Sequence, residues 1–279
     1  MKVISLINMK GGVGKTTLSV NVCDCLARRH NVKVLLVDVD PQFNATQCLM
    51  SGEDYVKYLK EDNDTILSVF DRNSRAMVSS VSGTTQRPER KLEDIKPYRV
   101  KKNFDLLPGN LELYRMEMTP GEGRENRLSK FLKEQEAKQA YDYVIIDTPP
   151  TPSVWMTSAL LASNYYLIPV KPDPISFTGI DLLQGIIDNK KENYDLSIQC
   201  AGIVLTIVEE NTRVYKQAVQ NLDSGRWKTY RYAKSVPKRT EIARTQTNKG
   251  YILDLHDNES KFALTGIVAE LIERTKDER

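Results

Sequence analysis

Short runs of apolar residues alternate along the chain with longer segments in which apolar residues recur every three or four positions. The short runs predict β-strands and the recurring pattern predicts helices. The predicted strands are residues 3–8, 33–38, 143–147, 165–170 and 203–207, and the predicted helices are residues 15–29 and about 124–140, 174–192 and 211–222. Strands that alternate with helices are typical of βαβ units. We therefore expect an α/β fold with a mostly parallel, twisted sheet and helices on both faces.

Two segments interrupt this alternation. Residues 71–103 are rich in Ser, Arg, Lys and Glu and have weak periodicity, which predicts a polar insertion or surface excursion, most simply a solvated loop without a dedicated role. Residues 211–250 form the second segment and are strongly basic. Neither an internal repeat nor a linker divides the 279 residues, and α/β folds of about 200–250 residues often form one domain. The prediction is a single domain over residues 1–279.

The charges of the whole chain nearly balance, since 40 Lys and Arg residues stand against 37 Asp and Glu residues. Hydrophobic residues make up 40% and charged residues 28% of the chain, which excludes a disordered tail protein and a histone-like chain. Four cysteines are too few for a disulfide scaffold and indicate a reducing compartment. Because the chain has neither an apolar run of about 18 residues nor a signal-peptide pattern, we expect a cytoplasmic protein.

A glycine-rich segment joins the first predicted strand to the first predicted helix. Glycines let backbone N–H groups approach a phosphate, and the helix N-terminus adds positive potential. The residues expected to bind a nucleotide here are Lys10, Gly11, Gly12, Val13, Gly14, Lys15, Thr16 and Thr17. Lys15 would reach the β- and γ-phosphates, and the Thr16 hydroxyl would bind Mg²⁺. The common pattern G-x-x-x-x-G-K-[ST] is not matched, because Met9 stands at its first glycine and Lys10 follows.

This segment resembles the deviant Walker A motif of the ParA/MinD ATPases, in which an extra lysine, here Lys10, marks the group. Residues 37–46 (VDVDPQFNAT) resemble the family segment after the second strand, although Phe43 stands where the family usually has glycine. Residues 143–150 (YVIIDTPP) resemble its Walker B strand and the switch that follows. Residues 168–170 and 236–250 match later landmarks more loosely, so that the resemblance covers nearly the whole chain except about 71–103.

Three aspartates follow or end predicted strands, at the sheet edge where ligands bind in open α/β folds: Asp38, Asp40 and Asp147. Carboxylates gathered near a phosphate loop favour a resident Mg²⁺. The resemblance implies that Asp40 positions or activates the attacking water and that Asp147 holds the metal's water shell. Asp38 has two interpretations, support of the metal site or Lys15, and a cap of the following turn.

The resemblance also assigns the remaining parts of the nucleotide site. It implies catalytic roles for Lys10, Lys15 and Asp40, and an Mg²⁺ site formed by Thr16 directly and by Asp40 and Asp147 through water. Lys10 would reach across a nucleotide-sandwich homodimer to the partner's phosphates. The loops after Thr206 and around Pro237 are the family-like candidates for base recognition.

The basic segment, residues 211–250, holds ten basic and two acidic residues, an excess of eight positive charges. Trp227, Tyr230 and Tyr232 lie among its cations. One interpretation is a solvated helix face followed by a strand; the other is a surface that binds DNA phosphates without reading bases. The resemblance favours the second, since ParA-like ATP dimers bind DNA nonspecifically. The candidate DNA-binding residues are Arg213, Lys238, Arg239 and Arg244.

The function implied is an ATP-dependent switch. ATP would drive homodimerisation and nonspecific DNA binding, and slow hydrolysis, stimulated by a ParB-like or other adaptor, would reset it. Such a protein partitions a plasmid, a chromosome or another cargo and associates with the nucleoid in its ATP state. A nucleotide-locked DNA-binding scaffold without turnover is disfavoured, because every catalytic position is occupied.

A MinD-like, membrane-associated positioning ATPase is the alternative, and it requires an amphipathic C-terminal helix with a basic face. Residues 264–279 gather Ile267, Val268, Leu271 and Ile272 on one side, but acidic residues on the other. We therefore expect this helix to pack on the domain and no membrane to be bound.

An iron–sulfur carrier is a third class, and the cysteines argue against it. Cys23 and Cys25 lie about 200° apart around a helix and cannot share a metal.

Overall fold

A computed structural model of the chain describes residues 1–71, 91–119, 121, 123–173 and 176–276. Among these residues, seven strands form one sheet in the order β3-β4-β2-β5-β1-β6-β7. The strands are β1 (Lys2–Leu6), β2 (Val34–Asp38), β3 (Tyr98–Lys101), β4 (Phe104–Leu107), β5 (Tyr143–Asp147), β6 (Tyr165–Val170) and β7 (Gln199–Leu205). All neighbouring pairs are parallel except β3 with β4. The predicted α/β fold with a mostly parallel sheet is confirmed.

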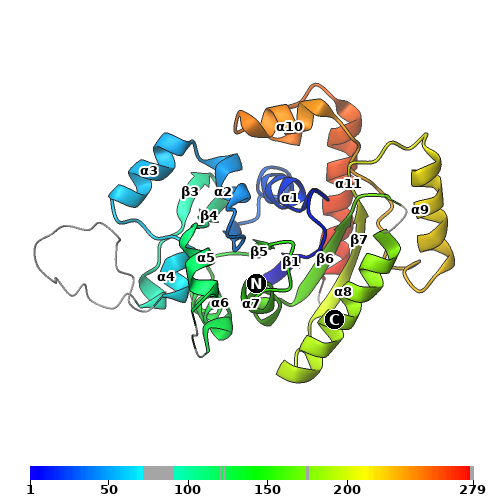
Figure 1. Cartoon of the computed structure of the whole chain (residues 1–279). Helices are drawn as coiled ribbons and strands as arrows, with labels where there is room; N and C mark the ends of the chain where they lie inside the picture. The colour runs from blue at the N-terminus through cyan, green and yellow to red at the C-terminus, as the bar shows by residue number, and fades with distance from the viewer. Residues whose placement is uncertain (72–90, 120, 122, 174–175, 277–279) are drawn as a thin grey trace, which may run out of the picture.

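Helices connect the strands on both faces of the sheet (Figure 1). The α-helices are α1 (Lys15–Arg29), α2 (Asn44–Leu49), α3 (Gly52–Lys60), α4 (Ile66–Phe70), α5 (Glu112–Glu117), α6 (Arg127–Ala137), α7 (Val154–Ala162), α8 (Ser176–Tyr194), α9 (Arg213–Ser224), α10 (Thr240–Thr247) and α11 (Asn258–Arg274). Three short 3-10 turns are η1 (Leu92–Asp94), η2 (Arg124–Asn126) and η3 (Ile252–Asp254).

The strands are apolar nearly throughout because both faces of the sheet are covered. In β5, Ile145 packs into the core that contains residues of α1 and α11, whereas Val144 and Ile146 pack into the core that contains residues of α4, α6 and α7. Residues of α8 form a third cluster with residues of β6 and β7. This double burial explains why the pattern of continuous apolar runs identified the central strands.

The polar segment 71–103 is corrected in part. Residues 72–90 lie outside the described residues, but the end of the segment forms β3, which pairs antiparallel with β4 at the edge of the sheet. β3 has no fully buried residue, so its sequence, YRVK, lacks an apolar run. The pattern also missed β4, whose four residues are buried. Two boundaries move as well: β1 ends at Leu6, and β7 starts at Gln199.

The C-terminal helix α11 packs on the domain, as predicted. Its residues Leu264, Ile267, Val268 and Leu271 are at most 1% exposed, and they contact the core that includes residues of α1. Among the described residues, no helix is long and apolar enough to span a membrane. The apolar side that a membrane-binding helix would insert is therefore occupied by the fold itself.

Candidate nucleotide site

The glycine-rich loop lies at the carboxyl edge of the sheet, where the chain changes direction. β1 lies between β5 and β6, and the chain leaves β1 through α1 to reach β2 on the far side of β5. Crevices at such switch points are the usual ligand sites of open α/β sheets. The strand register brings Asp147, at the end of β5, level with Leu6 of β1 and Asp38 of β2. The fold thus gathers the predicted loop and two of the predicted aspartates.

Hydrogen bonds within this loop and to two neighbouring segments fix its shape. Asn8 Nδ2 donates to the Pro169 carbonyl (2.7 Å), and the Lys10 N–H donates to Asn8 Oδ1 (2.8 Å). Thr206 Oγ1 donates to the Val13 carbonyl (2.6 Å). Gly14 caps α1 with φ 80°, a left-handed conformation that favours glycine. Asn8 was not predicted as a site residue, although an asparagine directly after a strand is a turn signal.

Lys15 is folded into the loop rather than into solvent. Its Nζ donates to the Asn8 carbonyl (2.9 Å) and the Lys10 carbonyl (3.4 Å), and the residue is 7% exposed. Burial lowers the pKa of Lys15 from its usual value, against the attraction of Asp147 and Asp40. A buried ammonium held by carbonyl oxygens can exchange these for phosphate oxygens, which carry more negative charge.

Asp147 is bound to two hydroxyls of α1. Thr16 Oγ1 donates to its Oδ2 (2.7 Å), and Ser19 Oγ donates to its Oδ1 (2.8 Å). Asp147 is fully buried, and burial raises its pKa to about 6 against these hydrogen bonds. The predicted Thr16 and Asp147 are therefore in direct contact. Ser19, one turn further along α1, was not predicted.

Asp38 holds the turn that follows β2 rather than Lys15. Its Oδ2 accepts hydrogen bonds from the backbone N–H and the hydroxyl of Thr46 (both 2.8 Å), and Thr46 Oγ1 accepts from the Gly109 N–H (2.8 Å). Burial and then the neighbouring Asp147 raise its pKa well above the usual range. Of its two interpretations, the structure supports the cap of the following turn.

Asp40 lies in the loop between β2 and α2. The Gln42 N–H donates to its Oδ1 (2.9 Å), and the Phe43 N–H donates to its backbone carbonyl (2.8 Å). Asp40 is 6% exposed, and burial raises its pKa from the usual value against the Gln42 hydrogen bond and the charge of Lys15. The carboxylate is thus fixed beside the loop that contains Lys15.

Phe43 adopts a left-handed conformation, with φ 40°, at the position where the resembled family usually has glycine. Its ring stacks on Tyr55 with 5.3 Å between centroids. The absence of a side chain at Gly109 makes room for Phe43, because a Cβ there would lie 2.6 Å from the Phe43 Cβ. Stacking and this clearance together explain how an aromatic residue occupies a conformation that usually requires glycine.

The Lys10 ammonium has a different partner from that of Lys15. It is about half exposed, and its ammonium forms an ion pair with Asp173, which follows β6. The two lysines of the motif thus have different surroundings: carbonyl groups of the loop hold the buried Lys15 ammonium, and Asp173 holds the half-exposed Lys10 ammonium.

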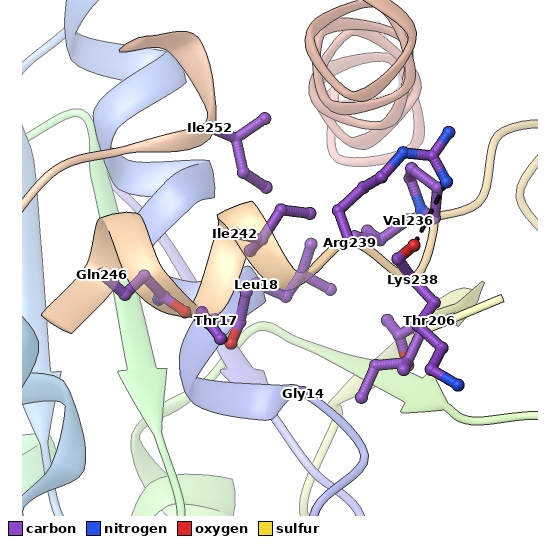
Figure 2. A pocket seen from close by; sticks show the side chains of 13 residues that line it. Gly14, Thr17, Leu18, Thr206, Val236, Lys238, Arg239, Ile242, Gln246 and Ile252 are labelled. Atoms are coloured by element: carbon purple, nitrogen blue, oxygen red, sulfur yellow. Dashed lines mark hydrogen bonds between the residues drawn. The ribbon is translucent and has the colours of Figure 1, made fainter. Parts of the chain in front are cut away.

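An apolar cavity of about 150 Å³ lies between the loop and α10 (Figure 2). Leu18 of α1 and Ile242 of α10 line it together with Ile252, and Pro237 forms part of its wall. Thr206 and Lys238 lie at the other side of the cavity. The two loops predicted for base recognition thus meet at one cavity next to the phosphate loop.

The four candidate DNA-binding cations fall into two groups. Arg213, at the start of α9, and Arg244, on α10, are exposed, and neither forms an ion pair within the part of the chain that the structure describes. Lys238 pairs with Glu209 (2.7 Å), and Arg239 pairs with Asp257 (3.2 Å) and Glu259 (2.6 Å). Lys238 and Arg239 also line the apolar cavity.

A metal ion would have to be held in large part by groups other than protein carboxylates. No three His, Cys, Asp or Glu side chains converge on a metal-sized space among the described residues. Thr16 and Asp147 nevertheless fit Mg²⁺, which keeps several waters and takes only one or two protein groups besides substrate phosphates. The donor set therefore suits a metal that arrives with a nucleotide.

Cys23 and Cys25 belong to the core and not to the candidate site. Cys23 and Cys25 are fully buried in α1, and burial raises the pKa of the Cys25 thiol to about 12. They behave as small apolar core residues, as predicted.

Comparison with known proteins agrees with this geometry. The family described as AAA domain (AAA_31) matches residues 1–200. Sporulation initiation inhibitor protein Soj of Bacillus subtilis (strain 168) is 31% identical over 223 residues, covering 79% of this chain and 78% of Soj. Chromosome partitioning protein ParA of Myxococcus xanthus is 27% identical over 265 residues, covering 93% of this chain and 83% of ParA. The chain belongs to the ParA-type partition ATPase family.

A solved structure shares the whole fold. A plasmid partition protein from Borrelia burgdorferi B31, bound to AMPPNP, has a TM-score of 0.74 at 22% identity, covering 98% of each chain. The helices and strands outside residues 1–200, including the cavity wall formed by α10, thus also belong to a shared architecture.

Proposed function

We propose that this partition ATPase is an ATP-dependent dimerising switch that binds DNA nonspecifically and hydrolyses ATP slowly to partition a plasmid, a chromosome or another cargo. The observation that carries the proposal is the buried Lys15 within a glycine loop, under the electrostatic influence of Asp147 and next to an apolar cavity. A polyphosphate, a metal ion and a base thus each have a complementary part of one site. The AMPPNP bound to the Borrelia protein supports the same ligand class here.

In the proposed complex, the backbone amides of residues 10–17 and the Lys15 ammonium bind the phosphates. Mg²⁺, when bound, neutralises phosphate charge as the terminal phosphate leaves. Thr16 would bind this ion and Asp147 would orient its waters. Pro237, Ile242 and Leu18 would enclose the base in the apolar cavity.

Asp40 is the proposed catalytic carboxylate. Its Oδ1 is oriented by the Gln42 N–H, and burial raises its pKa toward the range in which a general base works efficiently. Asp40 would accept a hydrogen bond from the attacking water and thereby orient it. Hydrolysis would stay slow until an adaptor, such as a ParB-like protein, completes the site.

Lys10 is the proposed link between ATP and the dimer. Its side chain is about half exposed, so its ammonium can exchange Asp173 for the phosphates of a second copy. A cation supplied from a partner to a phosphoryl-transfer site is worth about 10³–10⁵ in rate. Each half of the dimer would then complete the other's site.

DNA binding is assigned to the cations Arg213, Lys238, Arg239 and Arg244. A dimer doubles the positive charge that DNA meets, and this explains why a chain with a net charge of only +3 would need ATP to bind DNA.

The decisive experiment compares the wild type with Asp40→Ala and Lys10→Ala. We expect Asp40→Ala to retain ATP binding by calorimetry and to lose phosphate release by about 10²–10⁴-fold. Lys10→Ala should bind ATP as a monomer in light scattering, whereas the wild type forms a dimer. Glu192→Gln, on the exposed side of α8, is the control. Wild-type turnover by Asp40→Ala would remove Asp40 from the mechanism, and ATP-induced dimers of Lys10→Ala would exclude its role across the interface.

A further inference from the structure

Gln246, on α10, faces the candidate nucleotide site with half of its side-chain amide unused. Thr17 Oγ1 donates to Gln246 Oε1 (2.9 Å), and Figure 2 shows the two side chains pointing toward one another at the edge of the cavity that both line. Gln246 is 8% exposed. Its Nε2 finds no hydrogen-bond partner among the described residues.

A buried amide nitrogen without a partner is costly, because it has lost its water and gained nothing in exchange. Most buried polar groups in native proteins are paired, so each exception calls for an explanation. At Gln246 the surroundings supply one: the residue lines the apolar cavity together with Gly14 and Thr17 of the phosphate loop. The unused donor therefore lies beside the loop and the cavity where a nucleotide is expected.

The position of Gln246 selects the part of the ligand that it contacts. Thr17 ends the glycine-rich motif, where the phosphates are expected, whereas Ile242, one helical turn before Gln246, lines the apolar part of the cavity. Gln246 thus lies where the base side of the cavity meets the phosphate side. A nucleotide carries its ribose and α-phosphate at this junction, and both present oxygen acceptors.

We propose that Gln246 is a further nucleotide-binding residue, whose Nε2 donates a hydrogen bond to an oxygen of the sugar–phosphate link. This inference rests on the proposed function, since it assumes a nucleotide in the site. It adds a contact from α10 to a site that the sequence motifs place on α1 and the strand ends. Binding would thereby tie α10, which also carries Arg244, to the phosphate loop.

The test measures the affinity of ADP with Mg²⁺ by calorimetry, because ADP is not hydrolysed by an ATPase. Gln246→Met keeps the length of the side chain and removes both ends of the amide. Gln246→Glu keeps an acceptor for Thr17 and replaces only the donor. We expect about 10- to 100-fold weaker binding for Gln246→Met, and a larger loss for Gln246→Glu because its charge repels phosphate.

The matched control is Gln135→Met. Gln135, on α6, is 4% exposed and also has an unpartnered Nε2 among the described residues, but it does not line the cavity. Its replacement should leave ADP affinity unchanged. Thermal unfolding without nucleotide shows that each variant is folded before its affinity is compared.

Comparison of ADP with 2′-deoxy-ADP shows whether the acceptor is the ribose 2′-hydroxyl. If only ADP loses affinity in Gln246→Met, the contact is to the 2′-hydroxyl; if both nucleotides lose affinity equally, the contact is to an oxygen that both carry, on the phosphate or elsewhere on the sugar. Wild-type affinity in Gln246→Glu would overturn the proposal, because the Thr17 bond alone would then account for the residue. Wild-type affinity in Gln246→Met would overturn it too. Absence of ADP and ATP binding to the wild type would instead contradict the proposed function.

Discussion

The carboxyl edge of the sheet around the glycine-rich loop, here called the phosphate edge, buries its few charged side chains, whereas the basic segment exposes its many. At the phosphate edge, Lys15, Asp38 and Asp147 are at most 7% exposed, and each is hydrogen-bonded to groups of the loop or its neighbours. In the basic segment, residues 211–250, the cations lie at the surface. Within the described parts of the chain, four of its ten cations form ion pairs with acidic residues: Arg226 with Asp181, Arg231 with Asp223, Lys238 with Glu209, and Arg239 with Asp257 and Glu259.

This difference shows that the number of charged residues in a region does not measure the charge that a ligand or partner meets there. The excess of eight positive charges in the basic segment overstates what a partner molecule meets, since most of the paired acidic residues belong to other parts of the chain. At the phosphate edge the small number of charges understates their effect, because burial strengthens each interaction. Position and pairing decide what each charge can do.

The phosphate edge should tolerate little added volume at Gly109. In Gly109→Ala the new Cβ would lie 2.6 Å from the Phe43 Cβ and 3.0 Å from the Asp38 carboxyl carbon. We expect a loss of about 1–3 kcal/mol in the free energy of unfolding, measured in urea. The control is Gly185→Ala on α8, where a Cβ meets nothing within 4 Å, and where alanine should stabilise by up to about 1 kcal/mol.

A double variant shows whether Phe43 causes this loss. Phe43→Gly removes the Cβ that Gly109→Ala would strike and also relieves the left-handed backbone at position 43. We expect the two substitutions to couple by about 1–2 kcal/mol, so that the double variant is more stable than the sum of the single losses implies. Additive losses would show that the close approach to Phe43 does not limit this position.

In the basic segment, cations without an ion pair among the described residues should contribute more to DNA binding than paired cations. Replacing both Arg213 and Arg244 by alanine should weaken ATP-dependent binding to random-sequence DNA about tenfold. It should also reduce the slope of log affinity against log salt by about 0.9 for each DNA phosphate that the variant no longer neutralises. Fluorescence anisotropy over a series of salt concentrations measures both quantities.

Lys238→Ala with Arg239→Ala is the paired comparison. These cations already bind carboxylates, so their removal should change the salt slope less than removal of Arg213 and Arg244. Equal slopes for the two double variants would mean that DNA displaces Glu209, Asp257 and Glu259. ATP affinity is measured in parallel, because Lys238 and Arg239 also line the cavity.

The sequence predicted the phosphate edge well because its parts are local. Strand, glycine loop and helix follow one another within residues 2–29, and a residue such as Lys15 is placed by the loop that contains it. Asp147 comes from a distant strand, yet its position followed from the parallel register, which sets it level with Leu6. Continuous apolar runs identified β2, β5 and β6 because both faces of the sheet are covered.

The parts that the sequence did not reveal depend on contacts between distant segments. β3 is an edge strand without a buried residue, and no periodicity marks it. Gln246 meets Thr17 only because α10 folds over α1, and nothing in the local sequence separates it from a surface glutamine. The ion pairs of Arg239 also join distant segments, because Arg239 precedes α10 in the sequence whereas Asp257 and Glu259 follow it.

The smallest predicted effect tests whether the ion pair between Arg239 and Asp257 stabilises the folded chain. Asp257 caps α11 by accepting hydrogen bonds from the Glu259 and Ser260 N–H groups (3.0 and 3.3 Å), and it also pairs with Arg239. The hydrogen bond from the Ser260 hydroxyl, helped by the Ser260 N–H and then by the Arg239 charge, holds the pKa of Asp257 below its usual value. Its proton is therefore bound more weakly in the folded than in the unfolded chain. The stability that it contributes is present above pH about 4 and is lost as the pH falls through the lower, folded-state pKa.

Asp257→Ala should cost about 1 kcal/mol at pH 7, and the difference from the wild type should shrink toward pH 3. Asp257→Asn keeps a neutral cap and removes only the charge, so it should lose less at pH 7 and should converge with the wild type at low pH. Urea unfolding at several pH values measures the free energy of unfolding of each variant and of the wild type. Glu259, the other partner of Arg239, is unchanged in all three proteins. A gap between Asp257→Asn and the wild type that stays constant down to pH 3 would show that the charge of Asp257 is not engaged. Arg239 would then be more available to DNA than its ion pairs suggest. Pairing with acidic residues would then reduce the positive charge that the basic segment offers to DNA by less than the ion pairs indicate.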